Sequence, residues 1–169
     1  MSLSMYHASV PVFVHGLGNL SAILTKAEAY ASARKIEPQV LLNARLAPDM
    51  FAFTRQVQIA CDIVKGGVGR LAGLEIPSFA DTEASFAELQ TRIQNTLDFI
   101  QTATPAQLSG SEAKPIVLKV GGQEMKFEGQ PYLLQFVLPN FYFHSSMAYA
   151  ILRHNGLEIG KMDFLGKIQ

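Results

Sequence analysis

Apolar residues recur at alternating spacings of three and four along four long stretches of the chain, roughly residues 6–31, 48–73, 81–104 and 130–155. This spacing is typical of helices that bury one face in a bundle. Polar and charged residues occupy most of the remaining positions in each stretch. The pattern therefore predicts an all-α fold, a four-helix bundle.

Start and stop signals accompany these stretches. The second helix is expected to begin near Pro48. Backbone N–H groups in the first turn of a helix have no partner within the helix, so proline, which lacks an N–H, is tolerated there. Asp81 or Thr82 is the expected N-cap of the third helix. Pro139 predicts a kink or a late start in the fourth helix, since it cannot donate to the carbonyl one turn earlier.

The second stretch contains the run KGGVGR, residues 65–70. Each glycine in a helix weakens it by about 1 kcal/mol relative to alanine, so we expect close packing against a neighbour at Gly66, Gly67 and Gly69. The run lies inside a helix, whereas a phosphate-binding loop would follow a strand. It therefore does not predict a nucleotide site.

Two short β-prone runs, residues 116–120 and 124–127, flank a glycine pair between the third and fourth helices. This arrangement predicts a β-hairpin inserted between those helices. The tail after the fourth helix is too short for another long helix. We expect it to pack back over the bundle through apolar side chains that include Ile159 and Phe164.

Length and composition narrow the class of protein. The 169 residues, 49% of them hydrophobic, suit one domain spanning 1–169. Charges in every stretch of about twenty residues exclude a bilayer span, and the balance of 14 basic against 14 acidic residues gives no field that would attract nucleic acid. We expect neither a nucleic-acid partner nor a membrane. Cys61 as the single cysteine and a start without a secretory signal predict a cytoplasmic protein.

His144 carries the most distinctive chemistry, because it falls on the inward face of the fourth helix with Asn140 one turn earlier. A buried histidine is either held by a neighbouring polar group or serves as a metal or catalytic ligand. Asn140 is either a ligand or a partner for backbone freed by Pro139, and the second role is favoured because amide ligands to transition metals are uncommon. His15 lies opposite the apolar seam of the first helix and is expected to face solvent or a partner subunit.

On the second helix, Gln58 and Asp62 lie four residues apart beside the apolar stripe, where they could point into a pocket or form a solvated edge. Of the two glutamines there, Gln58 is favoured over Gln56 to face the pocket. Cys61 precedes Lys65 by one turn, a cation that could lower the pKa of the thiol. Free cysteines in helices are more often packing residues, so Cys61 is a weak nucleophile candidate.

Three segments carry a family resemblance: RLAPDMFAFTRQVQIACD at 45–62, DTEASFAEL at 81–89 and PNFYFHSSMAYAILRHNGLEIGKMDFLG at 139–166. They resemble a bacterial family of unknown function within the DinB/YfiT-like metalloenzyme superfamily, and the resemblance covers nearly the whole chain. It implies a four-helix bundle, a homodimer, and in many members a divalent metal held by three histidines. One of these comes from the second helix and two, one turn apart, from the fourth.

The resemblance also implies a ligand set. Leu152-Arg153 resembles the Leu-Arg pair that follows the fourth-helix ligands, which places His144 on the second histidine and Asn140 on the first. With the polar candidates of the second helix, the implied ligands are His144, Asn140, Gln58 and Asp62. The metal would be zinc, nickel or iron, although one imidazole with amide and carboxylate oxygens binds such ions less selectively than three imidazoles.

Two functional hypotheses follow. In the first and favoured one, the protein is a non-enzymatic dimeric module. Its small-molecule pocket in the bundle interior near His144 is then a degenerate divalent-metal site, and His144 is only a core hydrogen-bonding residue. In the second, it is a metal-dependent, thiol-using transferase or hydrolase-like enzyme with His144 as a metal ligand. The metal would then polarise a substrate oxygen as a Lewis acid or lower the pKa of a bound water or thiol.

Overall fold

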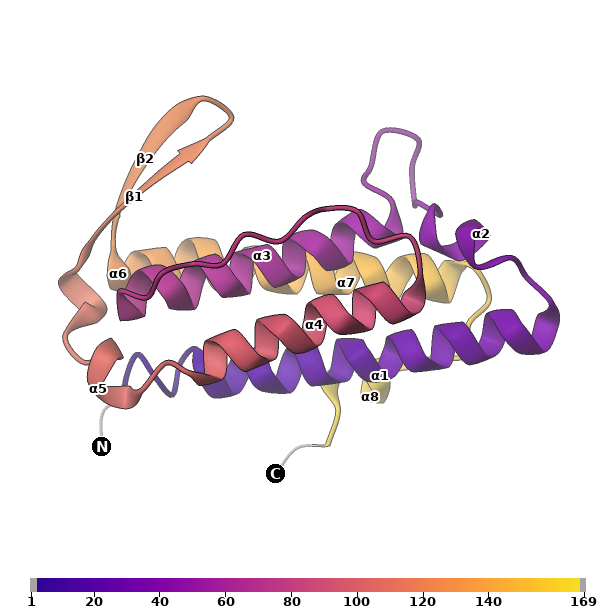
Figure 1. The fold of residues 1–169 in the computed structure, drawn as a ribbon, viewed down its shortest axis with the longest axis horizontal. Coiled ribbons are helices and arrows are strands. Elements are labelled where there is room, and N and C mark those ends of the chain that lie inside the picture. Colours follow the sequence, from indigo (N-terminus) through magenta and orange to yellow (C-terminus); the bar gives the residue numbers. More distant parts are fainter. Residues whose placement is uncertain (1–2, 168–169) are drawn as a thin grey trace.

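Four long helices lie side by side along the long axis of the molecule (Figure 1). They are α1 (Val10–Arg34), α3 (Phe53–Ala72), α4 (Phe86–Gln101) and α7 (Leu138–His154). In this computed structural model, which describes residues 3–167, α3 packs against α4 and α7, and α1 also packs against α4 and α7. The predicted all-α bundle is confirmed.

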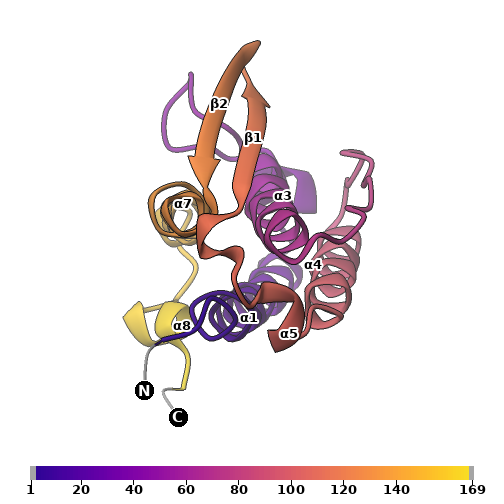
Figure 2. The same cartoon turned by 90° about the vertical axis from the view of Figure 1, so that its left-hand side faces the viewer.

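Short elements connect the long helices. They are α2 (Pro38–Leu42), α5 (Pro105–Leu108), η1 (Ser111–Ala113), β1 (Pro115–Val120), β2 (Gln123–Glu128), α6 (Gly129–Pro131), η2 (Tyr132–Val137) and α8 (Lys161–Leu165). β1 and β2 pair antiparallel, with Ile116 opposite Phe127. This is the predicted hairpin, and it projects from one end of the bundle, away from the helix axes (Figures 1 and 2).

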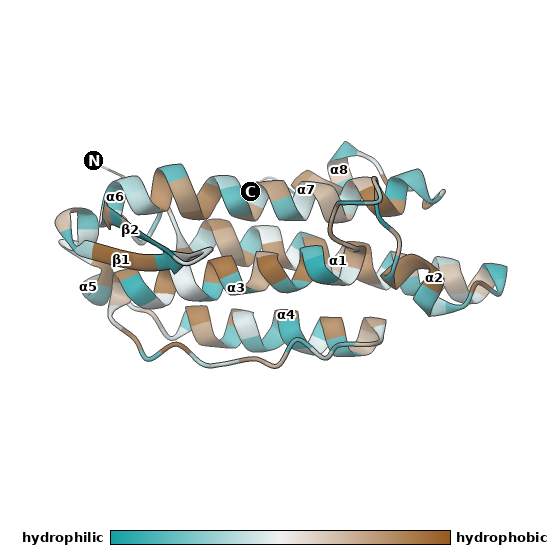
Figure 3. Cartoon of the chain, turned by 90° about the horizontal axis from the view of Figure 1, so that it is seen from above, coloured by the Kyte–Doolittle hydropathy of each residue, from teal (hydrophilic) through white to brown (hydrophobic). Residues whose placement is uncertain are grey.

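The core lies where the long helices meet. Polar and apolar residues interchange along each helix, as expected for helices that bury one face (Figure 3). The rings of Phe13 on α1 and Phe141 on α7 meet edge to face with centroids 5.4 Å apart, and Phe53 on α3 faces Phe86 on α4 at 6.4 Å. In the part of the chain that the structure describes, none of the helices is both long and apolar enough to cross a membrane.

The helices begin later than the spacing of apolar residues predicts. α1 begins at Val10, where Pro11 falls in the first turn, and α3 begins at Phe53, after a loop that includes Pro48. The expected capping of α4 by Asp81 or Thr82 is wrong. Ser85 is the N-cap, and its Oγ accepts a hydrogen bond from the backbone N–H of Glu88 at 3.1 Å.

Pro139 is accommodated by a π-helical turn, η2, that runs directly into α7. A π turn holds more residues than an α turn, so it changes which side chains face inward. The spacing of apolar residues in the stretch 130–155 predicts that Leu134 faces the core, but it is 48% exposed, whereas Leu133 and Val137 are buried. The predicted break at Pro139 is therefore real, but it takes the form of a wider turn before the proline.

The glycines of α3 allow other parts of the chain to approach closely, as predicted. A Cβ on Gly67 would lie 2.5 Å from Cγ1 of Val137, and one on Gly69 would lie 2.6 Å from Cγ1 of Ile76. Gly66 differs, because the atom nearest to its absent Cβ belongs to Arg70 of the same helix. Gly67 thus fixes how closely α3 approaches the π-helical turn.

Replacing Gly67 with alanine should destabilise the fold by about 1–3 kcal/mol, because the added methyl group overpacks the contact with Val137. Gly18 on α1 provides the matched control, since nothing lies within 4 Å of its absent Cβ. Gly18→Ala should raise the free energy of unfolding by up to about 1 kcal/mol. Urea unfolding followed by circular dichroism measures both changes; equal stability of the two variants would contradict the packing argument.

Candidate functional site

His144 lies buried on α7 and forms a hydrogen bond with α3. Its Nδ1 is 2.7 Å from Oε1 of Gln56, and Nε2 of Gln56 donates to the backbone oxygen of Phe51 at 3.1 Å. Because the amide nitrogen is committed to a carbonyl, the amide oxygen must accept, so Nδ1 of His144 carries the proton. The lone pair of the imidazole is therefore on Nε2.

The surroundings of His144 favour its neutral form. Burial, and then the positive charge of Arg55, lower the pKa of His144 below its ordinary value of 6.5. The hydrogen bond to Gln56 is compatible with this neutral form, in which Nδ1 donates and Nε2 keeps its lone pair. His144 therefore acts at neutral pH as an uncharged connection between α7 and α3.

Asn140, one turn before His144, uses its amide group on the backbone. Its Nδ2 donates to the carbonyl oxygen of Phe136 at 2.7 Å, in the π-helical turn that precedes Pro139. This contact matches the backbone role considered for Asn140 from the sequence. The amide nitrogen of Asn140 therefore stabilises the backbone next to Pro139.

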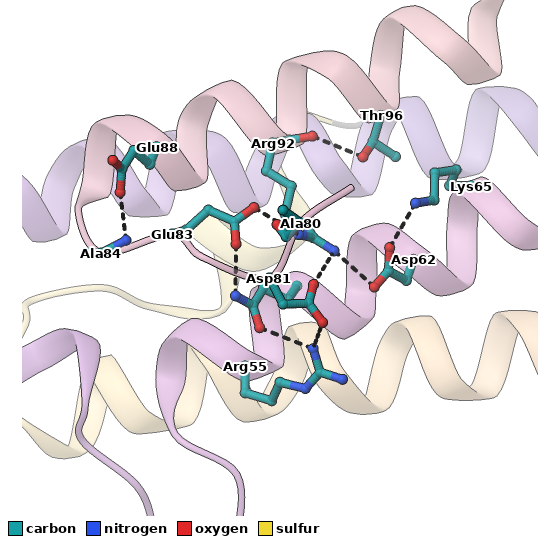
Figure 4. Close-up of polar contacts among 11 residues, drawn as sticks. Arg55, Asp62, Lys65, Ala80, Asp81, Glu83, Ala84, Glu88, Arg92 and Thr96 are labelled. Carbon is teal, nitrogen blue, oxygen red and sulfur yellow. Dashed lines mark hydrogen bonds and ion pairs between the residues drawn. The ribbon is translucent and has the colours of Figure 1, made fainter. Parts of the chain in front are cut away.

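Gln58 and Asp62 belong to a different group of side chains, which we call the Arg92 cluster: Arg55, Gln58, Asp62, Lys65, Asp81, Glu83 and Arg92 (Figure 4). Arg92 on α4 lies at its centre with a side chain only 1% exposed. Its Nη2 is 2.8 Å from Oδ2 of Asp62 and 3.0 Å from Oδ1 of Asp81, and its Nη1 is 2.7 Å from Oε1 of Glu83.

The Arg92 cluster joins α3, α4 and the segment between them. Gln58 donates to Glu83 at 2.7 Å and accepts from Arg55 at 3.1 Å, while Lys65 pairs with Asp62 at 3.0 Å. Three cationic side chains meet three carboxylates, so the charges of the cluster balance. Paired in this way, its members hold the segment 73–85 against the bundle.

The four side chains of the implied metal site therefore do not combine into one site. The pair on α7 contacts Gln56 and the backbone, and the pair on α3 is committed to the Arg92 cluster. Among residues 3–167, no group of three or more His, Cys, Asp or Glu side chains is placed to hold a metal ion. One imidazole nitrogen falls short of the three protein ligands that a catalytic zinc site uses, so the residues present do not fit the metal.

Sequence reasoning missed two residues that matter here. Gln56, favoured less than Gln58, faces His144; it lies three residues after Phe53 and four before Ala60, which places it on the buried stripe. Arg92 holds the same kind of position between Leu89 and Thr96 of α4. In both cases, a polar residue at a position on the apolar stripe of its helix could have indicated a buried polar contact.

Cys61 is fully buried, and burial raises the pKa of its thiol to about 12, although a hydrogen bond with Thr96 and the charge of Arg92 act in the opposite direction. Lys65, considered as a cation that could activate the thiol, pairs with Asp62. Cys61 is therefore a packing residue, the alternative that the sequence favoured.

A partly open cavity of about 500 Å³ lies between α1, α7 and α8. It is lined by Ser145, the residue after His144, and not by His144 itself. His15 is exposed, as expected, but its ring Nε2 lies 2.6 Å from the backbone oxygen of Leu165. Asn19 also donates to the oxygen of Phe164 at 3.1 Å, so the tail packs back over α1 as predicted.

Acidification should weaken the fold through Asp81. Partial burial opposes its ionisation, but the hydrogen bond and charge of Arg55, with those of Arg92, outweigh burial and lower the pKa of Asp81 below 3.8. The unfolded chain then binds the proton more readily, so this stabilisation is complete above about pH 5 and is lost as the pH falls below 4.

Asp81→Asn should lower the free energy of unfolding at pH 6 by up to about 1 kcal/mol and flatten its decrease between pH 5 and pH 3. Asp49→Asn, an exposed aspartate outside the Arg92 cluster, is the control. Urea unfolding at each pH measures the effect. An unchanged pH profile for Asp81→Asn would contradict the role assigned to this carboxylate.

Cys61 should resist thiol reagents while the protein is folded, because a buried thiol with a pKa of about 12 supplies almost no thiolate at pH 8. Treatment with a chromogenic disulfide reagent should release no colour from the native protein and one equivalent after unfolding in guanidinium. Rapid reaction of the native protein would contradict this assignment and bring thiol chemistry back into consideration.

The comparisons with known proteins agree with this architecture. The chain matches a crystal structure of a DinB family member protein from Shewanella denitrificans with 42% sequence identity and a TM-score of 0.91, over 97% of this chain and 93% of that chain. No curated protein matches the chain. The model of the family described as "Domain of unknown function (DUF1993)" matches residues 5–165. With a match over nearly its full length, the chain belongs to the DUF1993 family and has a mostly helical, DinB-like fold.

Proposed function

We propose that this protein is a small-molecule-binding module that works without a bound metal. The observation that carries the proposal is the 2.7 Å hydrogen bond between Nδ1 of His144 and Oε1 of Gln56. It joins α3 and α7, the two helices from which the resembling superfamily is expected to supply its metal ligands. Of the three histidines expected there, His144 alone is present, and Gln56 occupies its Nδ1 in a neutral hydrogen bond.

The neighbouring groups support a non-catalytic role. Asp62 and Glu83 are each paired with the buried cation of Arg92, so these carboxylates are poor general bases. The thiol of Cys61 is buried and protonated. The groups that acyl or group transfer would use are thus occupied in holding the fold.

A second candidate, the metal-dependent transferase or hydrolase-like enzyme, has one observation in its favour. A metal-ligating histidine usually donates its other ring N–H to an oxygen acceptor, which orients the ring. Nδ1 of His144 makes this kind of contact with Gln56, and its Nε2 keeps a lone pair. The two candidates differ in one measurable property, the metal content of the purified protein.

Protein purified without metal-affinity resin or chelator should contain much less than one equivalent of zinc, nickel or iron by elemental analysis. It should also take up none of these ions stoichiometrically in equilibrium dialysis, because one imidazole nitrogen is a weak site. Stoichiometric metal in the wild type that is lost in His144→Ala would overturn the proposal in favour of the enzyme.

The double substitution Gln56→His with Asn140→His tests the geometry directly. Together with His144 it provides three imidazoles, one from α3 and two from one face of α7, so this variant should bind one zinc ion. The double substitution Gln58→His with Asn140→His is the matched control. Its α3 histidine lies in the Arg92 cluster, away from His144, so only two imidazoles come together and zinc should bind much more weakly. Equal zinc binding by both variants would show that the position beside His144 is not special.

A further inference from the structure

We propose that the cavity between α1, α7 and α8 binds a small, largely apolar organic molecule that bears one hydrogen-bonding oxygen, in the manner of a medium-chain alcohol or carboxylic acid. This inference rests on the proposed small-molecule role and names its site and ligand class. The cavity differs from the interior pocket beside His144 that the sequence suggested.

The size and lining of the cavity suit such a ligand. Its volume of about 500 Å³ lies within the range of small-molecule sites. The walls are formed mainly by apolar side chains from three separate helices, namely Val12, Leu20, Ile23, Phe141, Tyr142 and Phe164. An apolar hollow of this size is filled more favourably by hydrocarbon than by water.

Ser145 supplies a polar contact inside this apolar lining. The residue is 4% exposed, and its Oγ has no hydrogen-bond partner among residues 3–167. A helical serine can bond the carbonyl four residues earlier, here that of Phe141, but Ser145 does not. Because Oγ is shielded from solvent in the free protein, a ligand oxygen reaches it after the Ser145 side chain rotates toward the cavity. Since a buried hydroxyl without a partner is unfavourable, the new hydrogen bond would remove this cost.

The charge of the lining indicates which ligands are excluded. The cavity is bordered by His15 and by Lys167, which is exposed, and its described lining contains no aspartate or glutamate. An ammonium group would meet no opposite charge there, whereas a carboxylate could approach Lys167. We therefore expect neutral and anionic ligands to bind better than cationic ones of the same length.

One wall of the cavity is held in place by polar contacts with α1. Besides the bonds of His15 and Asn19 to backbone oxygens of the tail, Lys26 pairs with Asp163 of α8 at 2.5 Å. These contacts hold α8 beside α1 (Figure 2). Phe164 and Leu165 of α8 thereby form part of the cavity wall. The lining described here is supplied by a single chain.

Isothermal titration of the full-length protein with 1-decanol, decanoate and decylamine tests the proposal, with decanol kept below its solubility limit and the two ionic probes below their critical micelle concentrations. Decanol and decanoate should bind with one site, and decylamine at least tenfold more weakly. Val12→Trp, which fills the cavity from a half-buried position, should abolish binding.

Ser145→Ala separates a ligand contact from a structural role. It should weaken decanol binding about tenfold, the value of one hydrogen bond, without lowering the Tm of the free protein, because it removes an unpartnered hydroxyl. Ser146→Ala, the next residue on α7 and outside the cavity lining, should leave binding unchanged.

Three results would overturn this inference: no binding of decanol or decanoate to the folded wild type, equal loss of affinity in the two serine variants, or a Val12→Trp protein that binds normally. Light scattering of wild type and Val12→Trp shows whether a second copy of the chain covers the cavity instead. Metal content tests the proposed function separately. If the protein contains no metal and binds no probe, only the proposed ligand site is refuted. If it binds the probe but also contains stoichiometric metal, only the metal-free role is refuted.

Discussion

The buried guanidinium of Arg92 is the interaction on which the arrangement of α3 and α4 depends. Removing this cation from water is costly, and the cost is offset because three carboxylates, from Asp62, Asp81 and Glu83, approach it together. The carboxylates come from α3 and from the segment that connects α3 to α4. Such a cluster forms only when all three parts of the chain are in place, so it makes the bundle specific as well as stable.

This arrangement leaves α3 with two different polar faces. One face, with Asp62 and Lys65, is saturated by charge partners, whereas the other reaches α7 through the neutral contact between Gln56 and His144. Ionic strength should affect the first face more than the second, because screening acts on charges and hardly on neutral hydrogen bonds. The charged face of α3 therefore stabilises the packing with α4, and the neutral face contacts α7, the helix that also lines the cavity.

Much of the fold could be predicted from the sequence, because the periodicity of apolar residues reports burial directly. The four helices, the hairpin and the close approach at Gly67 follow from such local patterns. The start of α4 did not, since the interactions that decide it are long-range: Arg55 and Arg92 hold Asp81, which would otherwise be a suitable cap, and Ser85 takes that place.

The candidate site was less predictable for the same reason. Which of Gln56 and Gln58 faces His144 depends on a rotation of α3 by about half a turn, which spacing alone did not resolve. The hydroxyl of Ser145 became notable only when its lack of a partner could be seen in three dimensions. The family resemblance indicated which helices contribute to a site. The contacts of the individual side chains, such as those of Gln56 and Gln58, became known only from the structure.

The π-helical turn before Pro139 has a consequence for comparing this chain with its relatives. A π turn is equivalent to one extra residue in an α-helix, so it rotates everything that follows by about 100° relative to what precedes it. A relative without this turn would align with the residues after Pro139 only if one position is skipped between residues 132 and 137. An ungapped alignment would be one position out of register after Pro139, so it would match the cavity position of Ser145 and the α3-facing position of His144 with the wrong residues of the relative. The loss or gain of a single residue in this turn would therefore change which side chains face the cavity and which face α3.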